Sequence, residues 1–411
     1  MYKRNPNHGG FKKSFSHAPS RFRRGNISRF NKFGKRGERS ERIDPAKFIN
    51  KKVVAEETEH FKPKHTFFDF KIDDALKQAV NARGYIVPTP IQDSAIPRIL
   101  DGLDVVGIAN TGTGKTGAFV IPLLHKVRLH PTGRTLIIVP TRELAIQIDQ
   151  ELKGFVSCIK TGMKVFSVCC VGGMSISRQI SDLHRGYNFI IGTPGRLKDL
   201  IGRKVVDLSH FNTIVLDEAD RMLDMGFIGD MRFVMAQMPK ARQTLFFSAT
   251  ISFEIEKLIS EFLREPVRIS VKTRETPRNV EQDVVRIENG AAKLDVLHDL
   301  LNQKDFIKVL IFARTKYGAE RLSKDLLKRG FSAESIHGNK NHSKRQRALG
   351  MFKESRIQIL VATDVAARGL DIADVSHVIN YDLPATYNDY VHRIGRTGRG
   401  DKHGKALTFI E

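Results

Sequence analysis

Features that direct a chain to a membrane, an oxidising compartment or a metal are scarce in this sequence. No apolar run approaches the length that crosses a bilayer, and no apolar core follows the N-terminal charges, so we expect neither a membrane span nor a secretory signal. The three cysteines, Cys158, Cys169 and Cys170, have neither metal-ligand spacing nor the pattern of a disulfide framework. We expect each to be a small buried residue in a reducing compartment, which favours a cytoplasmic location.

Acidic residues are few relative to basic ones. The 411 residues include 68 Lys and Arg but only 45 Asp and Glu, which gives a formal net charge of +23. Because such an excess attracts phosphates and displaces condensed counterions, we expect a polyanionic partner, with nucleic acid as the leading candidate. The length suits two α/β domains and a tail rather than one small domain.

The basic residues are concentrated at the N-terminus, where the first 43 residues carry 13 Lys or Arg against Glu38 and Glu41. Gly, Ser and Asn separate these charges, and single aromatic residues without periodicity cannot build a core. We predict a disordered basic tail and linker over residues 1–64. Two interpretations are open: an RNA tether that is indifferent to sequence, with rings stacked on unpaired bases, or a solubilising arm.

From Phe67 onward, short β-branched runs alternate with longer helical patterns, which is typical of parallel sheets with crossover helices. The expected strands are 105–109, 135–139, 164–171, 189–192, 213–216 and 244–247, followed by 284–287, 309–312, 333–336, 358–362, 377–380 and 406–410. A polar stretch containing Pro277 separates the two sets. The sequence therefore predicts an α/β fold with two domains, 65–271 and 281–411, joined by a hinge at 272–280.

The segment 109–116 reads Ala-Asn-Thr-Gly-Thr-Gly-Lys-Thr, a Gly-rich turn whose N–H groups can surround phosphate oxygens. Lys115 would reach the outer phosphates of a nucleoside triphosphate, and the Thr116 hydroxyl would face Mg²⁺. Asp217 follows the expected strand 213–216 and would bind Mg²⁺ through its water shell, while Glu218 could activate the attacking water. The segment 392–399, His-Arg-Ile-Gly-Arg-Thr-Gly-Arg, would supply arginines to the transferred phosphoryl group.

Residues 67 to about 410 resemble the DEAD-box ATP-dependent RNA helicases of superfamily 2, which implies two RecA-like domains. Besides the stretches above, the resemblance rests on ordered motifs at 84–92 with Phe67 upstream, 140–145, 172–173, 193–196, 248–250, 311–315 and 362–371. The Gly-Asn-Lys run after His337 and the compact length look most like the RhlE-type bacterial branch.

The resemblance implies roles for individual residues. ATP would contact Phe67, Tyr85, Gln92, Thr111, Gly112, Thr113, Gly114, Lys115, Thr116, Gly369 and Asp371, with Mg²⁺ at Thr116 and Asp217. Catalysis would involve Lys115, Asp217, Glu218, Ser248, Thr250, Arg396 and Arg399. RNA would contact Pro140, Thr141, Arg142, Gly172, Gly173, Thr193, Pro194, Gly195, Arg196, Arg314 and Thr363. The two arginines would approach the γ-phosphate only when the domains close, so ATP and RNA would each raise the affinity for the other.

The chain departs from the family pattern at two positions. Asn110 stands where Gln is usual in the phosphate loop, and His342 stands where Gln normally precedes Arg345, so His342 is either an RNA contact or a solvated residue at a helix start. A metal site at His337 and His392 lacks a supporting cluster of ligands. The sequence ends at Glu411, just beyond the last expected strand, so we expect any helix or tail that relatives append there to be absent.

Three functions are considered. The first is an RNA-dependent ATPase that unwinds short duplexes, the second is a DNA-directed motor of similar design, and the third is a catalytically inactive RNA clamp or annealing chaperone that acts through the tail. The resemblance favours the first, because the 84–92 motif and the acidic tetrad 217–220 belong to the RNA-acting branch and every hydrolytic residue is present. We expect a monomer that binds single-stranded RNA and short duplexes independently of sequence. Ribosome-assembly or RNA-degradation proteins are its candidate partners.

Overall fold

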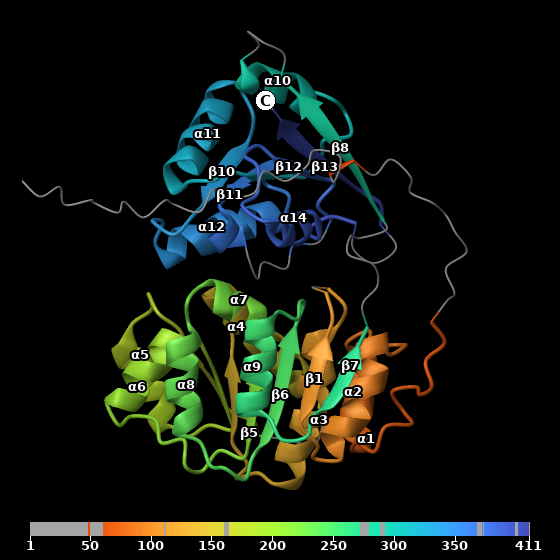
Figure 1. Cartoon of the computed structure of the whole chain (residues 1–411), viewed down its shortest axis with the longest axis vertical. Coiled ribbons are helices and arrows are strands. Elements are labelled where there is room, and N and C mark those ends of the chain that lie inside the picture. The colour runs from red at the N-terminus through yellow and green to blue at the C-terminus, as the bar shows by residue number, and fades with distance from the viewer. Residues whose placement is uncertain are drawn as a thin grey trace, which may run out of the picture. The chain divides into compact units, whose positions relative to one another are not determined.

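The computed structural model describes residues 48–49, 61–110, 112–159, 164–271, 279–287, 292–367, 372, 374–398 and 402–410. Within these residues the chain forms two α/β domains, each built on a parallel sheet (Figure 1). Most of the predicted tail and linker, and residues 272–278 of the predicted hinge, lie outside the described residues. The predicted domain boundaries therefore stay predictions.

The first domain contains a seven-stranded parallel sheet with the strand order β3-β4-β2-β5-β6-β1-β7. Its strands are β1 (Val105–Ile108), β2 (Thr135–Ile138), β3 (Ser167–Cys170), β4 (Phe189–Gly192), β5 (Thr213–Leu216), β6 (Gln243–Ser248) and β7 (Val267–Ser270). Its helices are α1 (Asp74–Ala82), α2 (Pro90–Leu100), α3 (Lys115–Leu129), α4 (Arg142–Cys158), α5 (Ile176–His184), α6 (Pro194–Gly202), α7 (Ala219–Asp224), α8 (Ile228–Ala236) and α9 (Phe253–Phe262).

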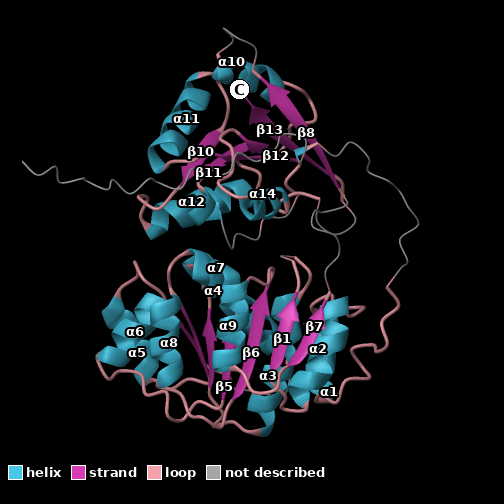
Figure 2. Cartoon of the chain, viewed as in Figure 1, coloured by secondary structure: helices cyan, strands magenta, loops and turns pink. Residues whose placement is uncertain are grey.

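Side chains of this sheet alternate between two hydrophobic clusters. On β2, Leu136 and Ile138 belong to one cluster and Ile137 to the other, because successive side chains of a strand point to opposite faces. The Ile137 cluster includes residues of α1 to α4, and the other includes residues of α5 to α9. Helices therefore cover both faces of the sheet (Figure 2), which explains why strands such as β2 and β5 are buried along their whole length.

The second domain has a six-stranded parallel sheet with the order β10-β11-β9-β12-β13-β8. Its strands are β8 (Val280–Arg286), β9 (Val309–Phe312), β10 (Ala333–Ile336), β11 (Ile359–Ala362), β12 (His377–Asn380) and β13 (Gly404–Ile410). Its helices are α10 (Lys293–Leu301), α11 (Lys316–Lys328), α12 (His342–Lys353), α13 (Asp364–Ala367) and α14 (Tyr387–Ile394). Residues of α10 and α11 pack in one cluster on the sheet, and residues of α12 to α14 pack in the other.

One residue of the predicted tail and linker is part of a core. Phe48 is 1% exposed and packs in the second domain, with its ring centroid 4.7 Å from that of Tyr390. Nearer the first domain, the backbone N–H groups of Lys64 and His65 donate to the buried carboxylate of Asp93 at 2.9 and 3.1 Å. Phe48, which lies in the predicted linker, therefore contributes to the core of the second domain.

Each expected strand occurs in the structure, with ends shifted by up to four residues. The sequence analysis missed β7, an edge strand whose single buried residue, Ile269, gives no apolar run. It also placed Val280 in the hinge, whereas Val280 begins β8 and is buried beside Phe48 in the same cluster.

No helix among the described residues is long and apolar enough to cross a membrane. Cys158, Cys169 and Cys170 are free thiols. Cys170 is fully buried, which raises the pKa of its thiol to about 12, and the other two are half-buried against the core of the first domain. The expectation of small apolar packing residues thus holds most clearly for Cys170.

Candidate nucleotide and RNA site

The sheet order of the first domain sorts the predicted site residues into two groups. Apart from Phe67, Tyr85 and Gln92, which precede β1, the motifs predicted for ATP and its hydrolysis follow β1, β5 and β6, which we call the nucleotide-side strands. Motifs predicted for RNA follow β2, β3 and β4, the RNA-side strands. Each group occupies adjacent positions in the sheet, and the two groups meet where β2 pairs with β5. Because the strands are parallel, both groups lie at the same edge of one sheet.

The Gly-rich turn after β1 is shaped by backbone that only glycine adopts easily. Gly112 and Gly114 have φ angles of +83° and +89°, and a Cβ on Gly114 would lie 2.5 Å from Nε2 of Gln92. The helix α3 begins at Lys115, so its first N–H groups point toward this turn. Lys115 is buried, and its Nζ donates to the carbonyl of Ala109 at 2.7 Å.

Gln92 contacts the phosphate turn directly. Its amide donates to the carbonyl of Gly114 at 3.0 Å and accepts from the N–H of Thr89 at 3.0 Å, and the side chain is buried. Both ends of the amide thus have protein partners. An amide can donate two hydrogen bonds and accept two, so these contacts still allow the expected contact to ATP, and that role stays a prediction.

The two aromatic residues predicted to contact ATP have different surroundings. Phe67 is 2% exposed and packs edge-on against Tyr85, so the structure places it in the core rather than at a surface. Tyr85 is half-buried, and its hydroxyl donates to Glu151 at 2.7 Å. Of the two, Tyr85 is the better placed to meet a base.

Two buried carboxylates follow β5. Burial raises the pKa of Asp217 to about 6, although the charge of Lys115 acts against this shift. For Glu218, burial also disfavours the charged form, but the charges of Arg221 and Lys115 outweigh it and lower the pKa. Glu218 lies 2.5 Å from Nη1 of Arg221 and has a φ of +53°, a backbone conformation that is costly for a side-chain-bearing residue.

Thr116 and Asp217 fit a magnesium ion by their donor chemistry, because a hydroxyl and a carboxylate are the oxygen ligands that Mg²⁺ prefers. A cation near Asp217 would also offset the cost of ionising this buried side chain. Among the described residues there is no group of three or more His, Cys, Asp or Glu side chains that could hold a metal by themselves.

Asp220 joins the acidic segment to the segment after β6. Its Oδ2 accepts hydrogen bonds from the N–H groups of Ala249 and Thr250 at 3.1 and 3.0 Å, and from the Thr250 hydroxyl at 3.0 Å. The Ser248 hydroxyl donates to the carbonyl of Thr250 at 2.8 Å. The sequence analysis gave Asp220 no role, although it lies in the acidic tetrad.

On the RNA-side strands, Arg142 lies over a pair of glycines. A Cβ on Gly173 would be 1.9 Å from Nη1 of Arg142, so a larger residue would displace this guanidinium group from its place, and the φ of Gly173 is +74°. Burial lowers the pKa of Arg142. Arg196, which follows β4, donates to Gln179 at 2.9 Å, and Gln179 in turn donates to the carbonyl of Val171 at 3.0 Å.

The other residues predicted for RNA in this domain lie at the same strand ends. Pro140 and Thr141 follow β2, Gly172 follows β3, and Thr193, Pro194 and Gly195 follow β4 and begin α6. The Thr141 hydroxyl caps α4 by accepting from the N–H of Leu144. The structure therefore brings all the predicted RNA contacts of the first domain to adjacent positions.

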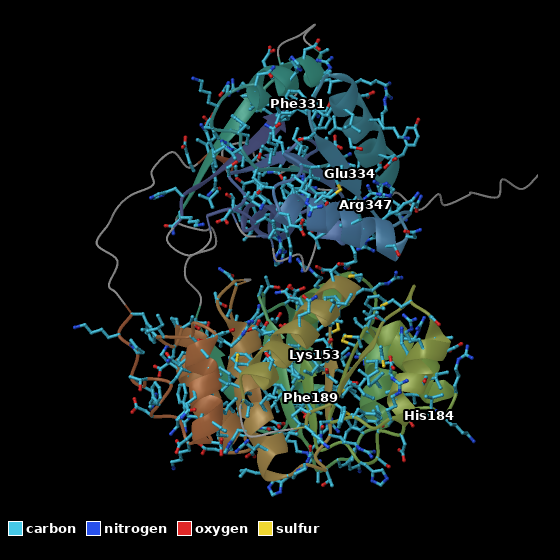
Figure 3. All side chains as sticks on the ribbon, turned by 180° about the vertical axis from the view of Figure 1, so that it is seen from behind. Lys153, His184, Phe189, Phe331, Glu334 and Arg347 are labelled. Carbon is cyan, nitrogen blue, oxygen red and sulfur yellow. The ribbon has the colours of Figure 1, made fainter. Side chains whose placement is uncertain are left out.

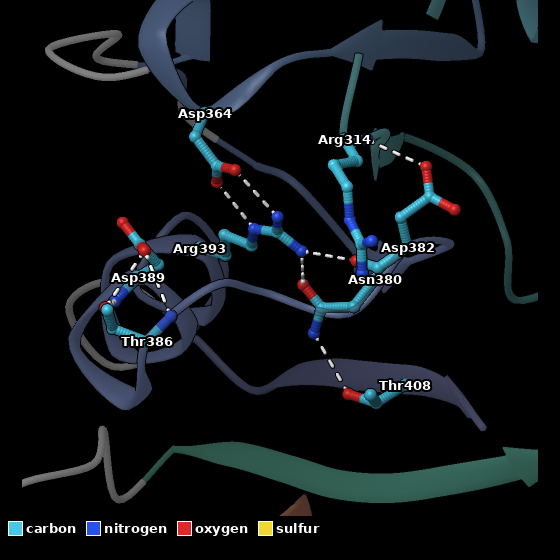
Figure 4. Close-up of polar contacts among 8 residues, drawn as sticks. All are labelled: Arg314, Asp364, Asn380, Asp382, Thr386, Asp389, Arg393 and Thr408. Carbon is cyan, nitrogen blue, oxygen red and sulfur yellow. Dashed lines mark hydrogen bonds and ion pairs between the residues drawn. The ribbon is translucent and has the colours of Figure 1, made fainter. Parts of the chain in front are cut away.

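In the second domain, Arg393 connects the ends of three strands (Figure 4). Its guanidinium group forms hydrogen bonds to both carboxylate oxygens of Asp364 at 2.6 and 2.7 Å, to the Asn380 side chain at 3.2 Å and to the Asp382 carbonyl at 2.7 Å. The Asp382 carboxylate accepts the N–H of Arg314 at 2.8 Å. Sequence analysis missed this network, since nothing in the sequence pairs Arg393 with partners up to 29 residues away.

The remaining residues predicted in this domain have simpler surroundings. Arg396 is buried just after α14, and Thr363 is buried at the end of β11. Four predicted residues lie outside the described residues: Thr111, Gly369, Asp371 and Arg399. Their roles stay predictions, as does the role of His342, whose side chain is likewise outside the described part.

Two family descriptions match the chain, DEAD/DEAH box helicase over residues 89–258 and helicase conserved C-terminal domain over residues 292–401. The DEAD-box ATP-dependent RNA helicase CshA of Bacillus subtilis is 45% identical over 351 residues, which cover 84% of this chain and 69% of that protein. The chain belongs to the DEAD-box RNA helicase family. The predicted enzyme class, a helicase that hydrolyses ATP, is confirmed at the level of this family.

Other similar proteins agree with this assignment. The ATP-dependent RNA helicase CshA of Listeria monocytogenes is 45% identical, with 84% of this chain and 66% of that protein covered, so the chain spans about two thirds of the length of these relatives. The RhlE-type branch is not confirmed, because these bacterial relatives are named CshA.

Solved structures of DEAD-box proteins share the fold. The helicase Mss116 bound to single-stranded RNA and UDP-BeF has a TM-score of 0.78 and 30% identity, with 85% of this chain and 76% of that chain covered. Dbp5 of S. cerevisiae bound to RNA and ADP BeF3 has a TM-score of 0.74 and 30% identity, with 84% and 89% covered. The predicted tandem RecA-like fold is therefore confirmed.

Proposed function

We propose that this protein is an RNA-stimulated ATPase that couples hydrolysis to local, non-processive opening of short RNA duplexes and to remodelling of RNA or RNA–protein complexes. The main support is the arrangement of the first sheet. The buried acids after β5 adjoin an arginine-bearing, glycine-lined surface, and the phosphate turn after β1 lies two strands further along the same edge. Adjacent sites on one rigid sheet can influence each other through the short segments that join them.

On the nucleotide side, the turn at 112–114 and the N-terminus of α3 bind the phosphates of ATP, and Lys115 neutralises the outer ones. Mg²⁺ at Thr116 and Asp217 would supply charge stabilisation to the phosphates. Glu218 orients and deprotonates the attacking water, since its lowered pKa keeps it ionised at neutral pH. Tyr85 and Gln92 contact the base.

On the RNA side, Arg142 and Arg196 bind the sugar-phosphate backbone, and the glycines at 172, 173 and 195 let it approach closely. Contacts of this kind carry no base information, so binding is independent of sequence. Arg314 and Thr363 extend the same type of contact to the second domain.

Hydrolysis requires positive charge at the γ-phosphate, and Arg396 and Arg399 supply it from the second domain. Because ATP and RNA favour the same arrangement of the protein, each raises the affinity for the other by the same factor. The bend imposed on one strand then disfavours its duplex partner. Asp220 is part of the acidic segment and contacts residues 249–250, so it transmits the state of the nucleotide to duplex opening.

The substitution Glu218→Gln tests the proposal because it removes the water-activating carboxylate but keeps an oxygen that can accept the hydrogen bond from Arg221. We expect RNA-stimulated turnover to fall by about three orders of magnitude while ATP and RNA still bind. ATPase assays with RNA, together with nucleotide and RNA binding by fluorescence, measure both effects. Glu261→Gln, at an exposed carboxylate of α9, is the matched control. Normal turnover in Glu218→Gln would exclude this role for Glu218.

The proposal extends to the cell in three respects. The basic residues 1–43 add RNA affinity and support annealing or clamping, because their charge suits a sequence-indifferent tether. The protein acts as a monomer in the cytoplasm, and proteins of ribosome assembly or RNA degradation are its partners. Light scattering on the purified protein tests the monomer, and crosslinking of RNA to the Glu218→Gln variant in cells tests the RNA targets.

A further inference from the structure

A charged cluster in the second domain gathers around one carboxylate of α11. Oε2 of Glu320 accepts a hydrogen bond from the Ser335 hydroxyl at 2.5 Å and lies 3.1 Å from Nε2 of His337 and 3.5 Å from Nζ of Lys340. Its Oε1 lies 3.4 Å from Nζ of Lys324. These contacts, the Ser335 hydrogen bond foremost, lower the pKa of Glu320 to about 2, so it is ionised across the physiological range.

Three of these four partners lie on β10 or in the turn that follows it. Ser335 is fully buried, and His337 is 6% exposed. The second ring nitrogen of His337, Nδ1, is buried without a hydrogen-bond partner among the described residues. Within that part of the chain, Glu320 is therefore the polar group that orients the imidazole ring.

The position of β10 explains why such an anchor matters. Among the described residues, β10 is an edge strand of the second sheet and pairs with β11 alone. A central strand is fixed by ladders on both sides, whereas the end of an edge strand has one free side. The side chain of Glu320 supplies contacts to the end of β10 in addition to its ladder with β11.

The turn after β10 leads to residues with the chemistry of phosphate binding. Asn341 caps α12 by accepting from the N–H of Lys344 at 2.9 Å, and the first turns of α12 also carry Arg345 and Arg347. The carbonyl of Ile336, one residue before His337, accepts from the N–H of Thr363 at 3.3 Å. Glu334 of β10 and Arg347 of α12 mark this part of the second domain in Figure 3.

We propose that Glu320 is a positioning residue that fixes the turn 337–341, and thereby sets the start of α12 and Thr363 as one surface for the RNA backbone. This inference rests on the proposed function, since it assumes that the second domain binds RNA. Glu320 itself touches neither RNA nor ATP. It acts through Ser335, His337 and Lys340.

The test compares three variants of the full chain. In Glu320→Ala, we expect the RNA concentration for half-maximal ATPase stimulation to rise about tenfold, while KM for ATP and the rate at saturating RNA stay within about twofold. Glu320→Gln keeps an oxygen acceptor for Ser335, so most of the RNA affinity should return. Glu354→Gln removes the same unit of negative charge from an exposed carboxylate that is paired with Arg356, outside the turn, and should resemble the parent protein.

Amide hydrogen exchange without RNA separates this inference from the proposed function. Glu320→Ala should speed exchange at residues 337–345 but not in β9, because only the turn loses its anchor. Unchanged exchange there would overturn the positioning role, whatever RNA does. Faster exchange with an unaltered RNA requirement would mean that this turn is not an RNA surface, which overturns both the inference and RNA binding by this part of the second domain.

Discussion

The two domains place their charged residues under opposite constraints. In the first domain, acids and a lysine crowd together, and two neighbouring carboxylates have pKa values shifted in opposite directions. In the second, an arginine is held by fixed acceptors at the ends of two strands, β11 and β12. The first arrangement suits groups that change protonation or ligands during a reaction, and the second suits a charge that must stay in place.

The largest effect should come from removing the fixed charge of the second domain. Arg393→Ala leaves Asp364 and Asn380 without their partner, so we expect a loss of about 3 kcal/mol in the free energy of unfolding and nearly complete loss of RNA-stimulated ATPase. Urea denaturation followed by circular dichroism measures the first effect. Arg329→Ala, at an arginine paired with Asp295 on the surface, is the control.

Arg393→Lys tests whether the charge of Arg393 or the geometry of its guanidinium group stabilises the second domain. Lysine keeps the charge but cannot bind both oxygens of Asp364 in the planar, two-pronged geometry of a guanidinium group. We therefore expect intermediate stability. Stability equal to that of the parent would show that charge alone holds these strand ends together.

A smaller loss of ATPase is expected from a substitution at Asp220, a carboxylate that hydrogen bonds hold in place in the first domain. In the parent protein, Oδ2 of Asp220 accepts hydrogen bonds from three donors. Asp220→Asn replaces this carboxylate with an uncharged amide. We expect ATPase to fall about tenfold and duplex separation per ATP hydrolysed to fall further, because the contact to residues 249–250 is weakened. Strand-displacement and ATPase assays on the same samples give the ratio. Equal losses in both would argue against a coupling role, and Asp199→Asn on the surface of α6 is the control.

The shifted acid predicts a pH dependence. Burial raises the pKa of Asp217 to about 6 in the protein without Mg²⁺, so its ionised form is lost as the pH falls through 6. We expect kcat/KM for Mg²⁺-ATP, which reports the free enzyme, to fall about tenfold per pH unit below that value. Stability has the opposite dependence: the folded state favours the protonated acid, so this side chain costs stability as the pH rises from its ordinary value of 3.8 toward 6. An activity profile that is flat between pH 7 and 5 would contradict the assignment.

The smallest effect concerns the N-terminal charge. Deletion of residues 1–43 should weaken RNA binding by less than about tenfold and reduce its dependence on salt, while ATPase without RNA stays within twofold. Binding titrations at several salt concentrations measure the slope. A slope equal to that of the full chain would leave these residues a role in solubility only.

The sequence predicted both sheets because β-branched runs mark buried parallel strands, as at 213–216, and because the motifs follow those runs. It missed β7, whose residues alternate between exposed and buried at a sheet edge. The sequence also did not predict the contacts of individual side chains. Gln92 bonds to a carbonyl 22 residues away, and no local pattern distinguishes that partner from a base.

The packing of Phe48 has a practical consequence for shortened versions of this protein. A chain that starts at residue 61 loses a core side chain of the second domain, although every residue removed precedes the first domain. Emptying such a site costs about 3 to 5 kcal/mol and uncovers the ring of Tyr390. A start at residue 44 removes the concentrated positive charge and keeps this aromatic contact, so the two truncations separate electrostatic effects from loss of core packing.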